Sequence, residues 1–148
     1  MPDSTTNALT LPATTLCLAL LASSSVSDVI TVDHDGTGDF STIAAGVAAA
    51  SDGDTVLIKA GTYFESNLEL SGDITIEGEL GPDQLPAVII DSQGSWHLRF
   101  QPGTDEMELK NLTLTGSRET SSSTVHANPK LVNCTFVDNG PLKPAEFG

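Results

Sequence analysis

The chain has 148 residues, with 20 acidic against 6 basic side chains and a formal net charge of −14 at pH 7. This balance excludes a nucleic-acid partner, which needs a basic face, and disfavours binding to an anionic membrane surface. The length suffices for one domain with a hydrophobic core.

Residues 1–27 differ in composition from the rest and predict a secretory signal peptide or a disordered leader. The apolar run 16–22 is followed by the small residues of 23–27, as in a cleavage region, although no basic residue precedes the run. The run is shorter than the roughly 20 apolar residues of a membrane span, and we expect no membrane span elsewhere. A secreted or cell-surface protein is therefore expected. Cleavage would remove Cys17 and leave Cys134 without a disulfide partner.

Residues 28–32 alternate and are β-branched, which predicts a first strand before a turn-rich loop over 33–39. The pattern then changes to a helical one, because Ile43, Val47 and Ala50 share one face. We expect a helix over 41–50, with Ser41 or Asp39 as its N-cap, covering the N-terminal end of the domain.

Short apolar segments then follow at regular intervals, separated by Gly, Pro, Asn, Asp and Ser. No gap has room for a crossover helix. The expected strands are 55–58, 68–70, 74–76, 88–90, 98–100, 107–109, 112–114 and 131–136.

The sequence also repeats itself with a period of 22 residues. The expected columns are Asn67, Asn111 and Asn133; Gly72, Gly94 and Gly116; and Leu68, Ile90, Leu112 and Cys134. An antiparallel sandwich would use similar strands but gives no reason for the period. The pattern predicts an all-β fold, a right-handed parallel β-helix (solenoid) of about four coils over 28–140 with an N-terminal α-helix cap. In such a fold we expect the Asn residues to adopt a left-handed backbone conformation and their side-chain amides to hydrogen bond from one coil to the next.

Residues 141–148 contain two prolines, which cannot continue a central strand. We interpret them as a C-terminal tail over the last coil or as the truncation point of a longer solenoid. An uncapped last coil also predicts end-to-end self-association.

Two segments, 36–43 and 53–65, resemble the N-terminal part of the pectin-lyase-like right-handed β-helix superfamily. Residues 61–65 read Gly-Thr-Tyr-Phe-Glu and are most similar to the opening signature of pectin methylesterases, Gly-x-Tyr-x-Glu. The resemblance spans roughly 28–140 and implies the β-helix fold. It is less specific for activity, because polysaccharide lyases and β-helix surface proteins share this opening.

The catalytic pattern of the esterases is incomplete here. Residues 134–136 match their Cys-x-Phe landmark, but the family's preceding Gln and following Gln-Asp-Thr-Leu segment are missing. Asp138 is the one carboxylate nearby, and it lacks an acid/base partner for ester hydrolysis. Residues 133–139 are more similar to the repeats of bacterial surface proteins and adhesins. We therefore predict no catalytic residue in this chain.

The functional prediction is a non-catalytic secreted or surface β-helix module, structural, adhesive or polysaccharide-binding, and the front part of a longer solenoid. The alternative is a carbohydrate-active enzyme, pectinesterase- or lyase-like, whose catalytic coils are missing or unrecognised. An acidic polysaccharide is the candidate partner of a carbohydrate-active or carbohydrate-binding chain.

Several other side chains are candidates for a site, and no metal or cofactor is predicted from them. Asp33, Asp35 and Asp39 could bind Ca²⁺, although a turn before a capped helix explains them equally. The other candidates are Asp91 with Arg99 as a lyase-like pair, or a solvated face; Asp105, Glu106 and Glu108 as a solvated acidic turn; Trp96 and Tyr63 as sugar-stacking side chains, with an inward core position favoured for Trp96; Cys134 as core; His34, His97 and His126, which lack ligand spacing; and Asn111 and Asn133 as glycosylation or ladder residues.

Overall fold

The structure is a computed structural model that describes residues 26–95, 97–102, 104, 106–117 and 128–140. Its elements are short, as the frequent turn residues predict. In chain order they are β1 (Val29–Val32), α1 (Ile43–Ala49), β2 (Thr55–Ile58), β3 (Gly61–Tyr63), β4 (Leu68–Leu70), β5 (Thr75–Gly78), β6 (Val88–Asp91), β7 (Leu98–Phe100), β8 (Glu108–Lys110), β9 (Leu112–Thr115), β10 (Lys130–Val132) and β11 (Thr135–Val137).

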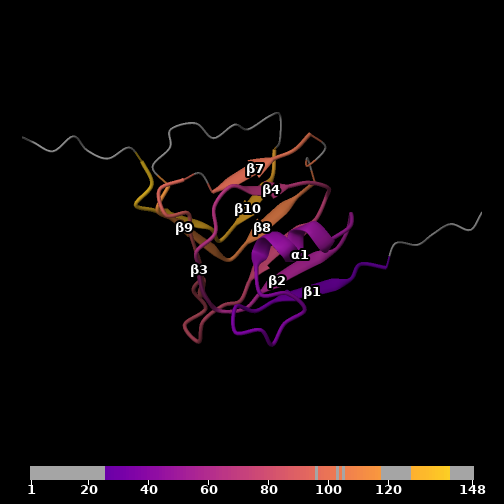
Figure 1. Cartoon of the computed structure of the whole chain (residues 1–148), viewed down its shortest axis with the longest axis horizontal. Helices are drawn as coiled ribbons and strands as arrows, with labels where there is room; N and C mark the ends of the chain where they lie inside the picture. The colour runs from indigo at the N-terminus through magenta and orange to yellow at the C-terminus, as the bar shows by residue number, and fades with distance from the viewer. Residues whose placement is uncertain (1–25, 96, 103, 105, 118–127, 141–148) are drawn as a thin grey trace, which may run out of the picture.

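The described strands form three parallel sheets that the chain visits in turn. The first sheet has the order β1-β2-β5-β8-β10, the second β11-β9-β6-β3 and the third β4-β7. All pairings between the named strands are parallel, and successive strands of one sheet come from successive turns of the chain (Figure 1). The fold is thus an all-β solenoid of about four turns, as predicted. Its right-handedness stays a prediction.

Alternate residues of each strand point into the solenoid and stack on their register partners. In the first sheet Val56, Ile76 and Leu109 are in register, and each is at most 2% exposed. In the second sheet Ile90 pairs with Leu114, and both are buried. This continuous apolar column supplies the burial that a single coil lacks.

The period of 22 residues holds for the last turn alone. Lys130 pairs with Glu108, but Leu112 pairs with Val88 rather than Ile90. Leu68 pairs with Leu98 in the third sheet, so the expected column of Leu68, Ile90, Leu112 and Cys134 is wrong. The reason is that loops of unequal length, such as 79–87, separate the strands of successive turns.

The Asn column is confirmed in part. Asn67, Asn111 and Asn133 all have left-handed backbone, with φ of 55°, 56° and 50°. The side-chain amide of Asn133 donates to Oδ1 of Asn111 at 2.9 Å, so these two form the expected ladder. Asn67 lies at another corner, before β4. Likewise Gly94 donates its N–H to the carbonyl of Gly116, while Gly72 lies at the corner after the third sheet.

Helix α1 is shorter than predicted, and its N-cap is Thr42 rather than Ser41 or Asp39. The reason is that Asp39 accepts a hydrogen bond from the N–H of Thr31 and is not free to cap. The helix packs against β1, β2 and β4 through a face that includes Gly46. A Cβ at Gly46 would lie 2.5 Å from Cγ2 of Val32, which explains a glycine there. Whether α1 acts as a cap stays a prediction.

Two strand assignments need correction, and one further expectation concerns membrane spans. The single strand expected over 131–136 is two strands, β10 and β11, with a corner at Asn133. Residues 61–63, not predicted as a strand, form β3. Among the described residues, no helix has the length and apolar character to cross a membrane.

Candidate functional site

The residues of the Gly-x-Tyr-x-Glu signature serve the fold. Tyr63 is 3% exposed, and its hydroxyl hydrogen bonds with the carbonyls of Lys59 at 3.0 Å and Val32 at 3.3 Å. Burial raises the pKa of Tyr63. The expected sugar stacking on Tyr63 is therefore wrong, because the ring is part of the core.

The signature's Glu65 binds the start of helix α1. Its carboxylate accepts hydrogen bonds from the N–H groups of Ile43 at 2.7 Å and Ala44 at 3.0 Å. Unpaired N–H groups and a partial positive charge at a helix start favour such a carboxylate. Because Glu65 follows β3, it ties the second sheet to the helix. The sequence analysis included Glu65 in the signature but did not predict that it binds the start of the helix.

The outer face of the second sheet forms a regular row, which we call the second-sheet face. Thr62, Ile89, Thr113 and Thr135 are in register across β3, β6, β9 and β11. Phe64 follows β3 on the same side of the strand as Thr62, and it is 63% exposed. The row thus combines three hydroxyl groups with two accessible apolar side chains. The sequence analysis did not identify it, since its members are unequally spaced along the chain.

The esterase-like landmark lies at the edge of this face. Cys134 is half-buried against the core, and its thiol lies 3.4 Å from the carbonyl of Leu109, which confirms its core role. Asp138 is exposed at the corner after β11, with left-handed backbone at φ 51°. Asp91 and Arg99 lie on different sheets, in β6 and β7, and Arg99 is 3.4 Å from Glu69. The ion pair of Arg99 that the structure shows is with Glu69 of β4, its neighbour in the third sheet.

The loop after β1 gathers two of the three aspartates proposed for Ca²⁺, together with a histidine. Ligand atoms of Asp33, His34 and Asp35 lie within 4.8 Å of one another. Asp33 accepts hydrogen bonds from the hydroxyl of Thr37 and the N–H of Asp35, and these bonds lower its pKa. Asp39 is not in this group. The same bonds hold the turn, which is the structural alternative to Ca²⁺ binding, and Ca²⁺ binding itself is untested.

Glu108 is not part of a solvated turn. It lies in β8, where its carboxylate is 2.8 Å from Nζ of Lys110 and 2.5 Å from Nζ of Lys130. Hydrogen bonds from these lysines lower its pKa. Glu106 is exposed, and its N–H donates to Asp73. The sequence analysis did not identify these ion pairs: Lys110 lies two residues along the same strand, and Lys130 is in register with Glu108 on β10.

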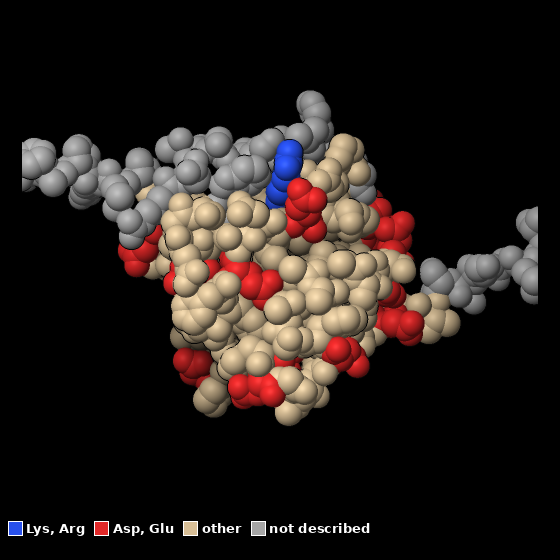
Figure 2. Space-filling model, viewed as in Figure 1, with Lys and Arg blue, Asp and Glu red and all other residues tan. Residues whose placement is uncertain are grey.

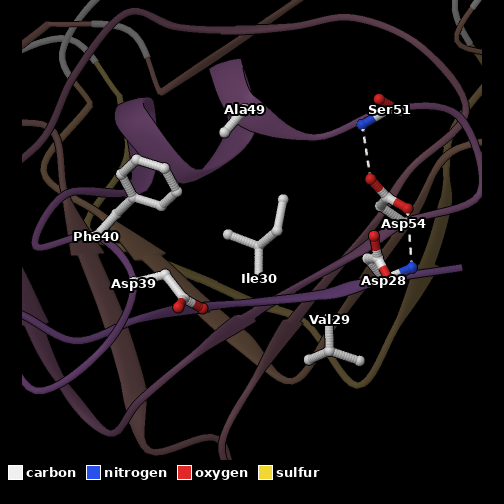
Figure 3. A pocket seen from close by; sticks show the side chains of 8 residues that line it. All are labelled: Asp28, Val29, Ile30, Asp39, Phe40, Ala49, Ser51 and Asp54. Atoms are coloured by element: carbon white, nitrogen blue, oxygen red, sulfur yellow. Dashed lines mark hydrogen bonds between the residues drawn. The ribbon is translucent and has the colours of Figure 1, made fainter.

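A cavity of about 520 Å³ opens beside β1 (Figure 3). Asp54 lies at its rim and accepts hydrogen bonds from the N–H groups of Asp28 and Ser51, both at 2.9 Å. These bonds lower the pKa of Asp54. Both carboxylate oxygens of Asp54 thus accept hydrogen bonds from backbone N–H groups. The lining residues are Asp28, Val29, Ile30, Asp39, Phe40, Ala49, Ser51 and Asp54.

The remaining candidates divide between described and undescribed positions. Trp96, Asp105 and His126 lie outside the described residues. Nε2 of His97 is 2.9 Å from Oδ1 of Asn139, a contact between distant turns. His34 lies edge-on to the ring of Tyr63. These contacts do not identify His34 or His97 as a catalytic residue.

The comparisons with known proteins give one partial match. A stretch of 56 residues is 50% identical to pectinesterase 3 of Citrus sinensis, and it covers 35% of this chain and 9% of the citrus protein. No protein-family model matches the chain, and no solved structure matches it. The similarity over this stretch and the β-solenoid fold together fit a pectin-lyase-like β-helix.

Proposed function

We propose that this chain is a non-catalytic module of a carbohydrate-related β-helix that contacts a polysaccharide through its second-sheet face. The observation that carries the proposal is the register of Thr62, Ile89, Thr113 and Thr135 beside the exposed Phe64. Strands of one sheet are about 4.8 Å apart, so the row is a flat, regular surface. An aromatic face offers apolar contact to a sugar ring, and hydroxyl groups both donate and accept hydrogen bonds.

The negative charge of the chain limits which chemical form of an acidic polysaccharide it can bind. With a net charge of −14, the protein repels a fully ionised polyanion. Lys59 and Lys110 are moreover paired with Glu79 and Glu108. On the face seen in Figure 2, acidic side chains are scattered between uncharged ones. We therefore propose that esterified, uncharged segments of an acidic polysaccharide are the preferred ligand. Such a ligand accords with the proposed secretion.

Affinity electrophoresis of the purified chain tests this proposal. Gels would contain pectin of high or low methyl esterification, or alginate, each with and without Ca²⁺. We expect highly esterified pectin to retard the chain most, and Phe64→Ala to reduce the retardation. Leu85→Ala is the matched control, since Leu85 is 59% exposed on a loop. Equal mobility in all gels would refute polysaccharide binding.

The similarity to a pectinesterase favours one alternative, an ester hydrolase. Two steps of ester hydrolysis need a nucleophile and an acid/base partner. Asp138, the carboxylate beside the Cys-x-Phe landmark, is the residue to test. Methanol release on the same pectins would measure ester hydrolysis, and the absorbance of unsaturated products would detect a lyase instead. Turnover that Asp138→Asn abolishes would establish the enzyme and overturn the non-catalytic role.

A further inference from the structure

The second-sheet face continues beyond its row of threonines into a second row. Asp91 follows Ile89 by two residues on β6, so both side chains point to the outer side of the sheet. Asp91 is in register with Thr115 of the neighbouring strand β9, and both residues are half-buried. The face thus carries a carboxylate beside its hydroxyl groups.

A cavity of about 390 Å³ opens at the end of this second row. It is lined by Asp91, Gln93, Gly94 and Gly116, all of which belong to the described part of the chain. Its volume lies within the range of small-molecule sites, about 300–1,000 Å³. Gln93 is exposed, and its side-chain amide can both donate and accept hydrogen bonds. The two glycines have no side chain to fill the space.

The backbone around the cavity fixes the position of the Asp91 carboxylate. Its Oδ1 accepts a hydrogen bond from the N–H of Gln93 at 2.8 Å. A Cβ at Gly116 would collide with this oxygen, so the carboxylate occupies space that any larger residue would take. Among the described residues, none donates a hydrogen bond to Oδ2 of Asp91. This second oxygen is therefore available to a ligand.

A carboxylate with an available oxygen selects between ligand groups by their charge. It accepts hydrogen bonds from sugar hydroxyl groups, but an ionised carboxylate has no hydrogen to donate to it. Like charges that face one another also disfavour the wrong partner. None of the four lining residues carries a positive charge that could offset this repulsion.

We propose that Asp91 makes the second-sheet face select esterified over ionised sugar acids. This inference rests on the proposed polysaccharide binding and identifies the residue behind its specificity. One sugar unit enters the cavity, where its hydroxyl groups donate to Oδ2 of Asp91 and exchange hydrogen bonds with the amide of Gln93. An ionised carboxylate at this position is repelled, whereas its methyl ester is uncharged and is accepted.

Affinity electrophoresis in pectin of high or low methyl esterification measures this selectivity for the full chain. Retardation is the loss of mobility relative to a gel without polysaccharide. Asp91→Asn keeps the size of the side chain and an oxygen for the N–H of Gln93, but it removes the charge. We expect the affinity for low-ester pectin to rise roughly five-fold, the factor for two unit charges about 4 Å apart in water. The affinity for high-ester pectin should not rise.

Asp52→Asn is the matched control. Oδ1 of Asp52 accepts a hydrogen bond from the N–H of Asp73 at 3.0 Å, and a Cβ at Gly72 would lie 2.5 Å from that oxygen. This arrangement resembles that of Asp91, but Asp52 precedes β2 of the first sheet and lies outside the second-sheet face. Its substitution changes the net charge equally and should leave the selectivity unchanged.

A second variant tests the same cavity in the opposite direction. Gln93→Glu adds a carboxylate at the cavity wall and should weaken binding of low-ester pectin further. It also serves if Asp91→Asn fails to fold, and circular dichroism would establish which variants are folded.

Three results would overturn the proposal. The first is unchanged selectivity in folded Asp91→Asn, or in Gln93→Glu where it is the variant used. The second is an equal change in Asp52→Asn. The third is Ca²⁺-dependent retardation by low-ester pectin that Asp91→Asn abolishes, since the carboxylate would then bridge a cation to an ionised sugar.

The same gels separate this proposal from the polysaccharide binding on which it rests. If no pectin retards the wild type, polysaccharide binding fails and the role of Asp91 fails with it. If high-ester pectin retards the wild type but Asp91→Asn leaves the selectivity unchanged, the role of Asp91 alone is refuted.

Discussion

At the scale of single residues, Glu65 links two elements that are separate in the sequence. Its carboxylate accepts two N–H groups at the start of α1. We expect Glu65→Ala to lower the free energy of unfolding by about 0.5–2 kcal/mol, the range for losing a side chain that accepts N–H groups at a helix start, although the N-cap Thr42 remains. Urea denaturation measures this loss.

Glu69→Ala is the matched control for Glu65→Ala. Glu69 lies four residues on, with a side chain 61% exposed and 3.4 Å from Arg99. A surface ion pair of this kind contributes about 0–1 kcal/mol. Equal losses in the two variants would show that Glu65 does not hold the helix.

Asp54 gives the chain a stability term that depends on pH. The N–H groups of Asp28 and Ser51 lower its pKa below the ordinary value of 3.8. A lowered folded-state pKa means that the contribution is complete above pH 3.8 and is lost as the pH falls through the folded-state pKa. Asp54→Asn should therefore lower the melting temperature at neutral pH. In strong acid, the difference from wild type should shrink, and a constant difference across pH would contradict the assignment.

At the scale of elements, the stacked inward columns hold the solenoid together. Leu112 in β9 is 1% exposed and pairs with Val88. Leu112→Asp buries an unpaired charge, which costs about 3–5 kcal/mol, a large share of the stability of such a domain. We expect loss of the cooperative thermal transition in circular dichroism.

Thr113→Asp is the control on the same strand, since Thr113 points to the outer face and is half-buried. It should retain the transition. A cooperative, β-rich melt of Leu112→Asp would show that the inward assignment of β9 is wrong.

The fold was predictable at this scale because short β-branched and apolar strands carry a local signal. The register was not, because it depends on loop lengths that leave no periodic trace. Asn111 and Asn133 were matched correctly, since the turn between them keeps the period. Asn67 shares the same backbone conformation at a different corner, so the residue type alone misled the alignment.

The candidate site was less predictable than the fold. Thr62 and Thr135 lie in one row because three pairings join strands that are far apart in the chain. No spacing in the sequence indicates such a row. The ion pairs of Glu108 were likewise not predicted, because Lys130 approaches through strand register, while Lys110 lies two residues along the same strand.

At the scale of the whole molecule, excess negative charge opposes folding. The described ion pairs involve few side chains, and the net charge of −14 leaves most carboxylates repelling one another. Salt screens such repulsion over about 10 Å at 0.1 M ionic strength. Salt also weakens the ion pairs of Glu108, but exposed pairs contribute only about 0–1 kcal/mol each.

We therefore expect NaCl to raise the melting temperature of the chain, because screening the repulsion outweighs weakening the pairs. Glu108→Gln should show a steeper rise with salt than wild type, since it has no such pairs to lose. A melting temperature that falls as NaCl is added would mean that the ion pairs, rather than the repulsion, dominate the electrostatics of the fold.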